Sequence, residues 1–195
     1  MNAEIEAKFL NINHEVIREK LKELGGELEH PMRLMRRVVF GDAHMREKHG
    51  WIRVRDEGNK VMIAYKQTDM LTIDGVKEIE TSVGDFDTAV AIFRQFDMDK
   101  ESFQESKRET WRLDDVEIVL DEWPWLEPFM EVEGQSETAV KDVAARLGLD
   151  WNDAYHGSVM TAYSAQYPWL STDDKIGDLP RVCFGDPLPE LFVKK

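Results

Sequence analysis

The sequence predicts an α+β fold built on a mainly antiparallel β-sheet that can close on itself. Three observations predict it. About eight segments alternate apolar and polar residues with the period of two that is typical of strands, and short turns join most of them in pairs. Segments with helical spacing separate some of these strands. Apolar residues make up 42% of the 195 residues, which is enough to bury a core and excludes global disorder.

The first half of the chain supplies five strands and two helices. Asn13 can cap the first helix and Gly25 can end it, and Asp85 can cap the second helix. The turn Glu57-Gly58-Asn59 predicts a hairpin between the third and fourth strands. In chain order we expect a strand at 3–10, a helix at 14–24, strands at 33–41, 51–56, 60–67 and 76–83, and a helix at 86–96.

The second half supplies three strands, two helices and a C-terminal arm. Strands at 104–113 and 116–122 form a hairpin, and 127–133 is the last strand. Ser136 begins a helix that ends at Gly148, and a shorter helix at 158–166 stops before Pro168. We take 1–167 as one domain. The arm, 168–195, is expected to pack on the exterior of the closed sheet or on the neighbouring subunit of a homodimer.

The chain is acidic, with 25 Lys and Arg against 39 Asp and Glu and a net charge of −14. This balance argues against a long nucleic acid as partner and against a basic membrane-surface protein. No stretch approaches the ~18 apolar residues that a membrane span requires. Cys183 is the only cysteine, which excludes an intramolecular disulfide and a Cys-rich zinc site. A reducing cytoplasm is therefore the expected location.

Several predicted strands carry charged residues on one face and apolar residues on the other, because residues i, i+2 and i+4 of a strand share a face. For a single strand, a solvated face explains this pattern. Taken together, however, the charges form same-sign pairs that repel each other at about 7 Å unless opposite charges or ions lie across from them. These pairs are Glu4 and Glu6, Arg53 and Arg55, Glu78 and Glu80, and Glu131 and Glu133.

If the sheet closes with these faces inward, its lumen is charged and cannot be a dry core, because burying unpaired charge is prohibitive. Basic residues suit a polyphosphate, and surplus acids suit a hard divalent cation such as Mg²⁺. The expected bases are Lys8, Arg53, Arg55, Lys66 and Arg108, and the expected acids are Glu4, Glu6, Glu78, Glu80, Asp121, Glu131 and Glu133.

The run Glu4-Ile5-Glu6-Ala7-Lys8 has the Glu-x-Glu-x-Lys form that opens the CYTH domain, also called the triphosphate tunnel metalloenzyme fold. The chain resembles this family over roughly residues 1–165, and the remaining matches follow in family order. They are Trp51-Ile52-Arg53-Val54-Arg55, Met62-Ile63-Ala64-Tyr65-Lys66, Glu78-Ile79-Glu80, Lys107-Arg108 with Trp111, Leu120-Asp121-Glu122 and Phe129-Met130-Glu131-Val132-Glu133-Gly134.

The resemblance implies an eight-stranded antiparallel β-barrel that forms a tunnel with flanking helices, a need for Mg²⁺ or Mn²⁺, and a small triphosphate substrate. By position it implies that the five bases bind phosphates and that Glu4, Glu6 and Lys8 take part in catalysis. It also implies that the seven acids bind the metal. For some of them the resemblance leaves a second role open. The acids that could instead position water are Glu4, Glu6, Asp121, Glu131 and Glu133, and those that could instead hold the basic residues in place are Glu78 and Glu80.

Two features leave the site open. Ser106 stands where the family often has a lysine, and the strand at 33–41 cannot be phased, so that either Arg36 or Arg37 enters the lumen. The leading hypothesis is a metal-dependent triphosphatase acting on inorganic, thiamine or nucleoside triphosphate. The second is a class IV adenylate cyclase, whose strand and helix layout is similar. The third is a non-enzymatic module that binds polyphosphate or nucleotides.

Overall fold

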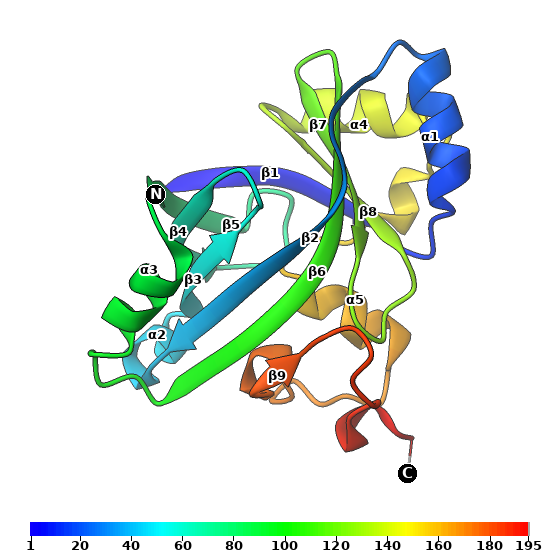
Figure 1. Cartoon of the computed structure of the whole chain (residues 1–195). Helices are drawn as coiled ribbons and strands as arrows, with labels where there is room; N and C mark the ends of the chain where they lie inside the picture. The colour runs from blue at the N-terminus through cyan, green and yellow to red at the C-terminus, as the bar shows by residue number, and fades with distance from the viewer. Residues whose placement is uncertain (195) are drawn as a thin grey trace.

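The computed structural model describes residues 1–194 and confirms the closed antiparallel barrel (Figure 1). Its strands follow the order β2-β3-β4-β5-β1-β8-β7-β6, and β2 pairs with β6 to close the ring. A short β9 runs parallel to β6 outside this ring. The strands are β1 Asn2–Phe9, β2 Glu27–Gly41, β3 Gly50–Asp56, β4 Val61–Thr68, β5 Val76–Val83, β6 Lys100–Leu113, β7 Val116–Glu122, β8 Phe129–Gly134 and β9 Arg181–Val182.

Helices flank the barrel, and the side-chain caps of three of them are those predicted. Asn13, Asp85 and Ser136 each accept hydrogen bonds from backbone N–H groups of the first turn. Within residues 1–194, no helix is both long enough and apolar enough to cross a membrane. The helices are α1 His14–Glu23, α2 Ala43–Glu47, α3 Phe86–Phe93, α4 Glu137–Arg146 and α5 Met160–Gln166, with 3₁₀ turns at Trp151–Asp153, Ile176–Asp178 and Glu190–Phe192.

Two strands are longer than the sequence predicts. β2 begins at Glu27 rather than at residue 33, and β6 begins at Lys100 rather than at residue 104. The β2 extension pairs with residues 110–112 of β6, with register shifts around His30, and the β6 extension pairs with residues 38–41 of β2. Local alternation does not reveal them because their stability comes from the partner strand. Helix α2, capped by Asp42, was also not predicted.

Apolar packing covers the outer face of the barrel. Helices α1 and α4 bury Leu21 and Val140 against Ile118 and Val132 of β7 and β8. Helix α3 packs in the same way on β2 and β3. Because the two faces of a strand alternate, the charged residues next to these apolar ones point into the lumen. Burial of the outer face therefore determines that the charged face is the inner one.

The segment from 168 to 194 folds against the barrel and α5. Phe192 is 2% exposed, and its ring centroid lies 5.2 Å from that of Tyr163 and 4.6 Å from that of Tyr167. Val182 and Cys183 are fully buried. The C-terminal segment is thus part of the hydrophobic core.

Replacing Phe192 with Ala is expected to lower the free energy of unfolding by about 3 kcal/mol, because it leaves a cavity among aromatic rings. Urea denaturation followed by circular dichroism measures the change. Val193→Ala is the matched control, since Val193 is 51% exposed and its loss should change stability little. Equal stabilities of the two variants would contradict this packing.

Candidate active site

The register of the barrel brings the predicted site residues together, because paired residues on neighbouring strands share a face. Lys8 lies opposite Glu131, and Glu6 lies opposite Glu133, between β1 and β8. Arg108 lies opposite Asp121 between β6 and β7. The predicted residues that the structure places on the inner face and partly or fully buries are Glu4, Glu6, Lys8, Arg53, Arg55, Lys66, Glu78, Arg108, Asp121, Glu131 and Glu133.

Glu80 has a different environment. It shares the face of Glu78 and lies opposite Ala64, but it is exposed, because β1 pairs with β5 only as far as Glu78. Among residues 1–194 it forms no ion pair. Glu80 therefore lies at the rim of the tunnel rather than in the central charge network.

Arg37 is a site residue that the sequence left ambiguous. It lies opposite Arg55 on β3 and Gln104 on β6, which places it in the lumen at 6% exposure. Arg36 points outward, where its Nε donates to Asp56 at 3.0 Å. The sequence 36–40 could not settle this phase because two arginines are followed by two valines, so that neither face is uniquely apolar.

Arg33 and Glu57 were not predicted as site residues. Glu57 follows β3 in the expected turn, yet it is 5% exposed. It accepts a hydrogen bond from Arg55 and lies 3.7 Å from Arg33. Burial opposes ionisation, but the positive charges of Arg55 and Lys60 lower the pKa of Glu57 below its ordinary value. Glu57 thus holds two lumen arginines in place, a role that only the folded turn reveals.

One side of the lumen, formed by β2, β3 and β6, is an arginine wall made of Arg33, Arg37, Arg53, Arg55 and Arg108. Burial and the positive charge of Arg55 lower the pKa of Arg37 well below its ordinary value. The same two causes lower the pKa of Arg53 to about 10. Four of these side chains have a buried Nε with no hydrogen-bond partner in residues 1–194: Arg33, Arg37, Arg53 and Arg55. Such unsatisfied donors are costly in a folded protein and are what a bound anion would satisfy.

The opposite side, formed by β1, β5, β7 and β8, is a carboxylate wall crossed by basic side chains. Lys8 Nζ lies 2.6 Å from Glu6 and 3.2 Å from Glu131. Arg108 also donates to Glu131 at 2.8 Å. Burial disfavours the Glu131 charge, but Lys8 and Arg108 lower the pKa of Glu131 to about 2. Glu131 is therefore ionised and links the two walls.

Lys66 makes the second link. Its Nζ donates to Glu4 at 2.8 Å and lies 3.2 Å from Glu78, which also pairs with Arg53 at 3.1 Å. Ion pairs of this depth are strongly destabilised when one member is lost, because the other charge remains buried. The lumen is consequently held by two groups of ion pairs, one around Lys66 and Glu78 and one around Lys8, Glu131 and Arg108.

Among residues 1–194, Glu133 has no basic partner of this kind. Burial and the negative charges of Glu4 and Glu6 raise its pKa to about 7. Within residues 1–194, no three acidic, histidine or cysteine side chains are preassembled as a metal site, since Glu4 and Glu6 face lysines. The three carboxylates nevertheless fit a hard divalent cation, which prefers oxygen ligands and would relieve their repulsion.

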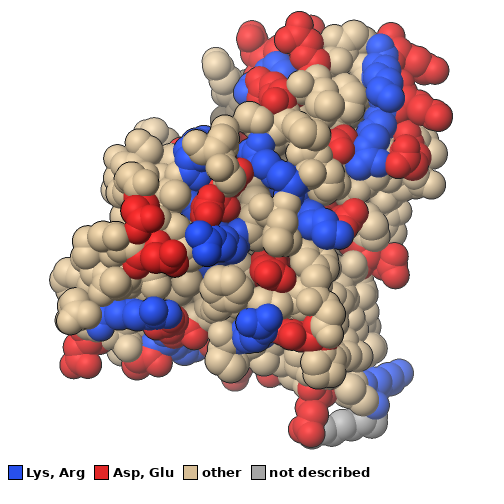
Figure 2. All heavy atoms as spheres, in the orientation of Figure 1, with Lys and Arg blue, Asp and Glu red and all other residues tan. Residues whose placement is uncertain are grey.

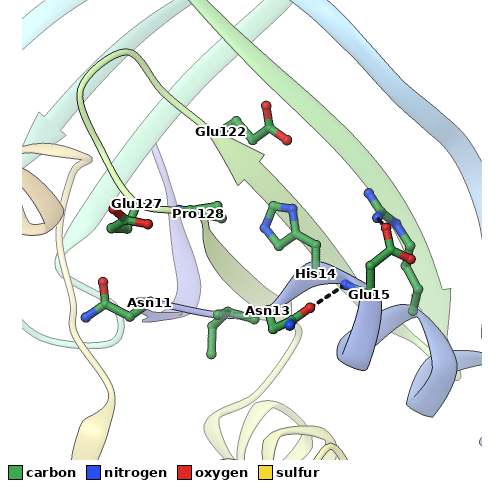
Figure 3. Close-up of a pocket in the computed structure, with 9 residues that line it drawn as sticks. Asn11, Asn13, His14, Glu15, Glu122, Glu127 and Pro128 are labelled. Atoms are coloured by element: carbon green, nitrogen blue, oxygen red, sulfur yellow. Dashed lines mark hydrogen bonds and ion pairs between the residues drawn. The ribbon is translucent and has the colours of Figure 1, made fainter.

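A hollow of about 610 Å³ on the outside of the barrel offers a different candidate (Figure 3). Asn13 points to the α1 backbone, which it caps, and His14 Nε2 lies 3.0 Å from the Phe129 carbonyl oxygen. Arg18 is paired with Glu109. These side chains already have structural roles, and the hollow contains none of the lumen residues, so the lumen remains the candidate site.

This closed antiparallel barrel, with an arginine wall facing a carboxylate wall in its lumen, is the tunnel architecture that the sequence resemblance implies. The family model of the CYTH domain matches residues 2–157. The chain belongs to the CYTH domain family.

Solved structures share this fold. The PH1012 protein from Pyrococcus horikoshii is 26% identical with a TM-score of 0.65, over 77% of this chain and 93% of that one. A candidate adenylate cyclase from Vibrio parahaemolyticus is 16% identical with a TM-score of 0.67, over 84% and 98%. HpAC1 from Hippeastrum, described as having a dominant triphosphatase activity, is 15% identical with a TM-score of 0.53, over 85% and 94%. No curated protein sequence matches significantly.

Replacing Glu133 with Gln is expected to stabilise the metal-free protein at pH 8. The raised pKa means that the folded state loses stability as pH rises from the ordinary value of 4.5 through about 7. The Gln variant escapes this loss, so its advantage of roughly 2 kcal/mol at pH 8 should shrink toward pH 5. Thermal unfolding with a chelator present measures it, and an advantage that does not change with pH would contradict the assigned environment.

Proposed function

We propose that the protein is a divalent-metal-dependent triphosphatase that hydrolyses a small triphosphate in the barrel lumen. The observation that carries this proposal is the set of four buried arginine Nε groups that have no partner in residues 1–194, opposite the Glu4, Glu6 and Glu133 carboxylates. An arginine guanidinium matches the oxygens of a phosphate in a forked geometry. Facing cationic and acidic walls suit an anion that carries several charges together with a metal ion.

The arginine wall would bind and orient the phosphate chain. Arg53 and Arg55 occupy successive inward-facing positions of β3, and Arg37 lies opposite Arg55 on β2, so their charges are gathered in one place before the ligand arrives. Preorganised charge of this kind stabilises the added negative charge of a phosphoryl-transfer transition state without reorganisation. Lys8 and Lys66 add two further basic groups, which lie beside Glu6 and Glu4 respectively.

The carboxylate wall would hold the metal and the nucleophile. Glu133, Glu4 and Glu6 would hold Mg²⁺ or Mn²⁺, which when bound supplies Lewis-acid polarisation of a phosphoryl oxygen. Glu4 or Glu6 orients the attacking water and accepts its proton. The water oxygen bonds to a terminal phosphorus while the bridging P–O bond breaks, so that orthophosphate and the shortened chain are released.

The exterior supports a small substrate. On the face in Figure 2, Lys and Arg side chains are interspersed with Asp and Glu. Elsewhere in residues 1–194, partly exposed basic side chains are paired with acidic ones, including Arg112 with Glu29 and Arg36 with Asp56. A long polyanion would find no continuous basic surface there, whereas a short one can reach the lumen.

Product analysis tests the reaction. The protein is incubated with tripolyphosphate, thiamine triphosphate or ATP, each with Mg²⁺, Mn²⁺ or a chelator, and products are identified by phosphorus NMR. We expect orthophosphate from at least one substrate, and none with the chelator. Formation of cyclic AMP and pyrophosphate from ATP would contradict the hydrolase and show that the protein is an adenylate cyclase. Binding without turnover would leave only a polyphosphate-binding module.

Removing Arg55 tests the site. Arg55→Ala is expected to lower kcat/KM at least about 100-fold, because one charged contact to the transition state is lost. Arg36→Ala is the control, since Arg36 lies near Arg55 in the fold but points outward. Triphosphate hydrolysis that survives Arg55→Ala unchanged would show that the reaction takes place elsewhere.

A further inference from the structure

The turn between β3 and β4 holds Glu57 in a fixed position. The N–H of Glu57 donates to the Lys60 carbonyl oxygen at 2.9 Å, and the N–H of Gly58 donates to the Asp56 carboxylate at 2.8 Å. Gly58 has φ +86°, a left-handed conformation that glycine adopts without steric cost. Glutamate is rarely buried unless it is paired, yet Glu57 is 5% exposed while residues 58–60 are exposed. The turn therefore directs this carboxylate into the protein.

Glu57 is the acid that pairs with Arg55. One of its carboxylate oxygens accepts a hydrogen bond from Arg55 Nη2, and the other lies 3.7 Å from Arg33 Nη2. Lys60 approaches the same carboxylate at 3.6 Å with a side chain that is 50% exposed. Within residues 1–194, neither Arg55 nor Arg33 forms an ion pair with any other acid. The charge of Arg55 therefore depends on Glu57 for its compensation.

Arg55 also lies among like charges. Arg37 lies opposite it on β2, the strand beside β3 (Figure 1), and Arg53 precedes it on the same inner face. Because an arginine side chain is long and flexible, repulsion from these neighbours favours conformations in which the Arg55 guanidinium turns away from the lumen. The hydrogen bond to Glu57 opposes this movement and engages only Nη2. The buried Nε of Arg55 has no partner in residues 1–194 and stays available to an anion.

We propose that Glu57 is a positioning residue of the triphosphatase, whose carboxylate holds the Arg55 guanidinium in the lumen with its Nε available before the phosphate chain arrives. This inference rests on the proposed function. A carboxylate repels phosphate, so Glu57 acts through Arg55 rather than on the substrate. Without the charge of Glu57, Arg55 must be ordered whenever a ligand binds, and that ordering reduces both affinity and transition-state stabilisation.

Hydrolysis of tripolyphosphate with Mg²⁺ tests this role in two variants. Glu57→Gln keeps the shape of the side chain and removes its charge, whereas Glu57→Asp keeps the charge. We expect kcat/KM to fall about tenfold or more in Glu57→Gln and by a smaller factor in Glu57→Asp. Unchanged kcat/KM in Glu57→Gln would overturn the role. So would a Glu57→Asp variant that is no more active than Glu57→Gln.

Asp115→Asn is the matched control, because it removes one negative charge from an exposed position in another hairpin turn. Its kcat/KM should stay within about twofold of the wild-type value, since an exposed charge is screened by salt. Wild-type protein that hydrolyses no triphosphate would overturn the proposed function, and this role with it. An active wild type with an equally active Glu57→Gln variant would overturn only the role of Glu57.

A double-mutant cycle separates positioning from general stability. Because Glu57 acts through Arg55, Glu57→Gln should lower kcat/KM by less than about threefold in the Arg55→Ala background. A decrease in this background as large as that in the wild-type background would show that Glu57 supports the fold independently of Arg55, and the positioning role would be wrong.

Discussion

The fold depends on compensating charges of both signs in the interior of a closed barrel. The two signs of charge are separated across the lumen, with an arginine wall on β2, β3 and β6 and a carboxylate wall on β1, β5, β7 and β8. Lys8, Lys66 and Arg108 bridge the walls and satisfy most of the acids. What remains uncompensated is a group of arginine Nε donors and the Glu133 carboxylate. Those are the groups that a phosphate chain and a divalent cation would complete.

The rest of the structure keeps this charged interior in place. An apolar outer face under α1, α3 and α4 forces the charged face inward. The register of the neighbouring strands then decides which charges meet, because it pairs Arg37 with Arg55 and Lys8 with Glu131. The C-terminal segment packs on the barrel and α5 through Val182 and Phe192. Net charge of the whole chain, −14, therefore says little about a site whose cations are gathered inside.

Strand alternation predicted a sheet that can close and most of the lumen residues. The face on which a charged residue lies does not change when the predicted strand boundaries shift by a residue or two. It did not predict the β2 and β6 extensions, each of which is held by pairing with the other strand. Nor could it choose between Arg36 and Arg37, because both positions are charged and both following residues are apolar. Glu57 was hidden because a turn sequence gives no sign that its carboxylate folds back to Arg55. The packing of residues 168–194 depends on contacts distant in sequence.

The most direct test is a crystal structure of the protein with imidotriphosphate and Mn²⁺, in which anomalous scattering locates the metal. The segregated lumen predicts phosphate oxygens within hydrogen-bonding distance of Arg37, Arg53 and Arg55, and Mn²⁺ on the side of Glu133, with its anomalous peak inside the barrel. Ligand density outside the barrel, for example in the hollow beside His14, with the arginine Nε groups still unpartnered, would contradict it.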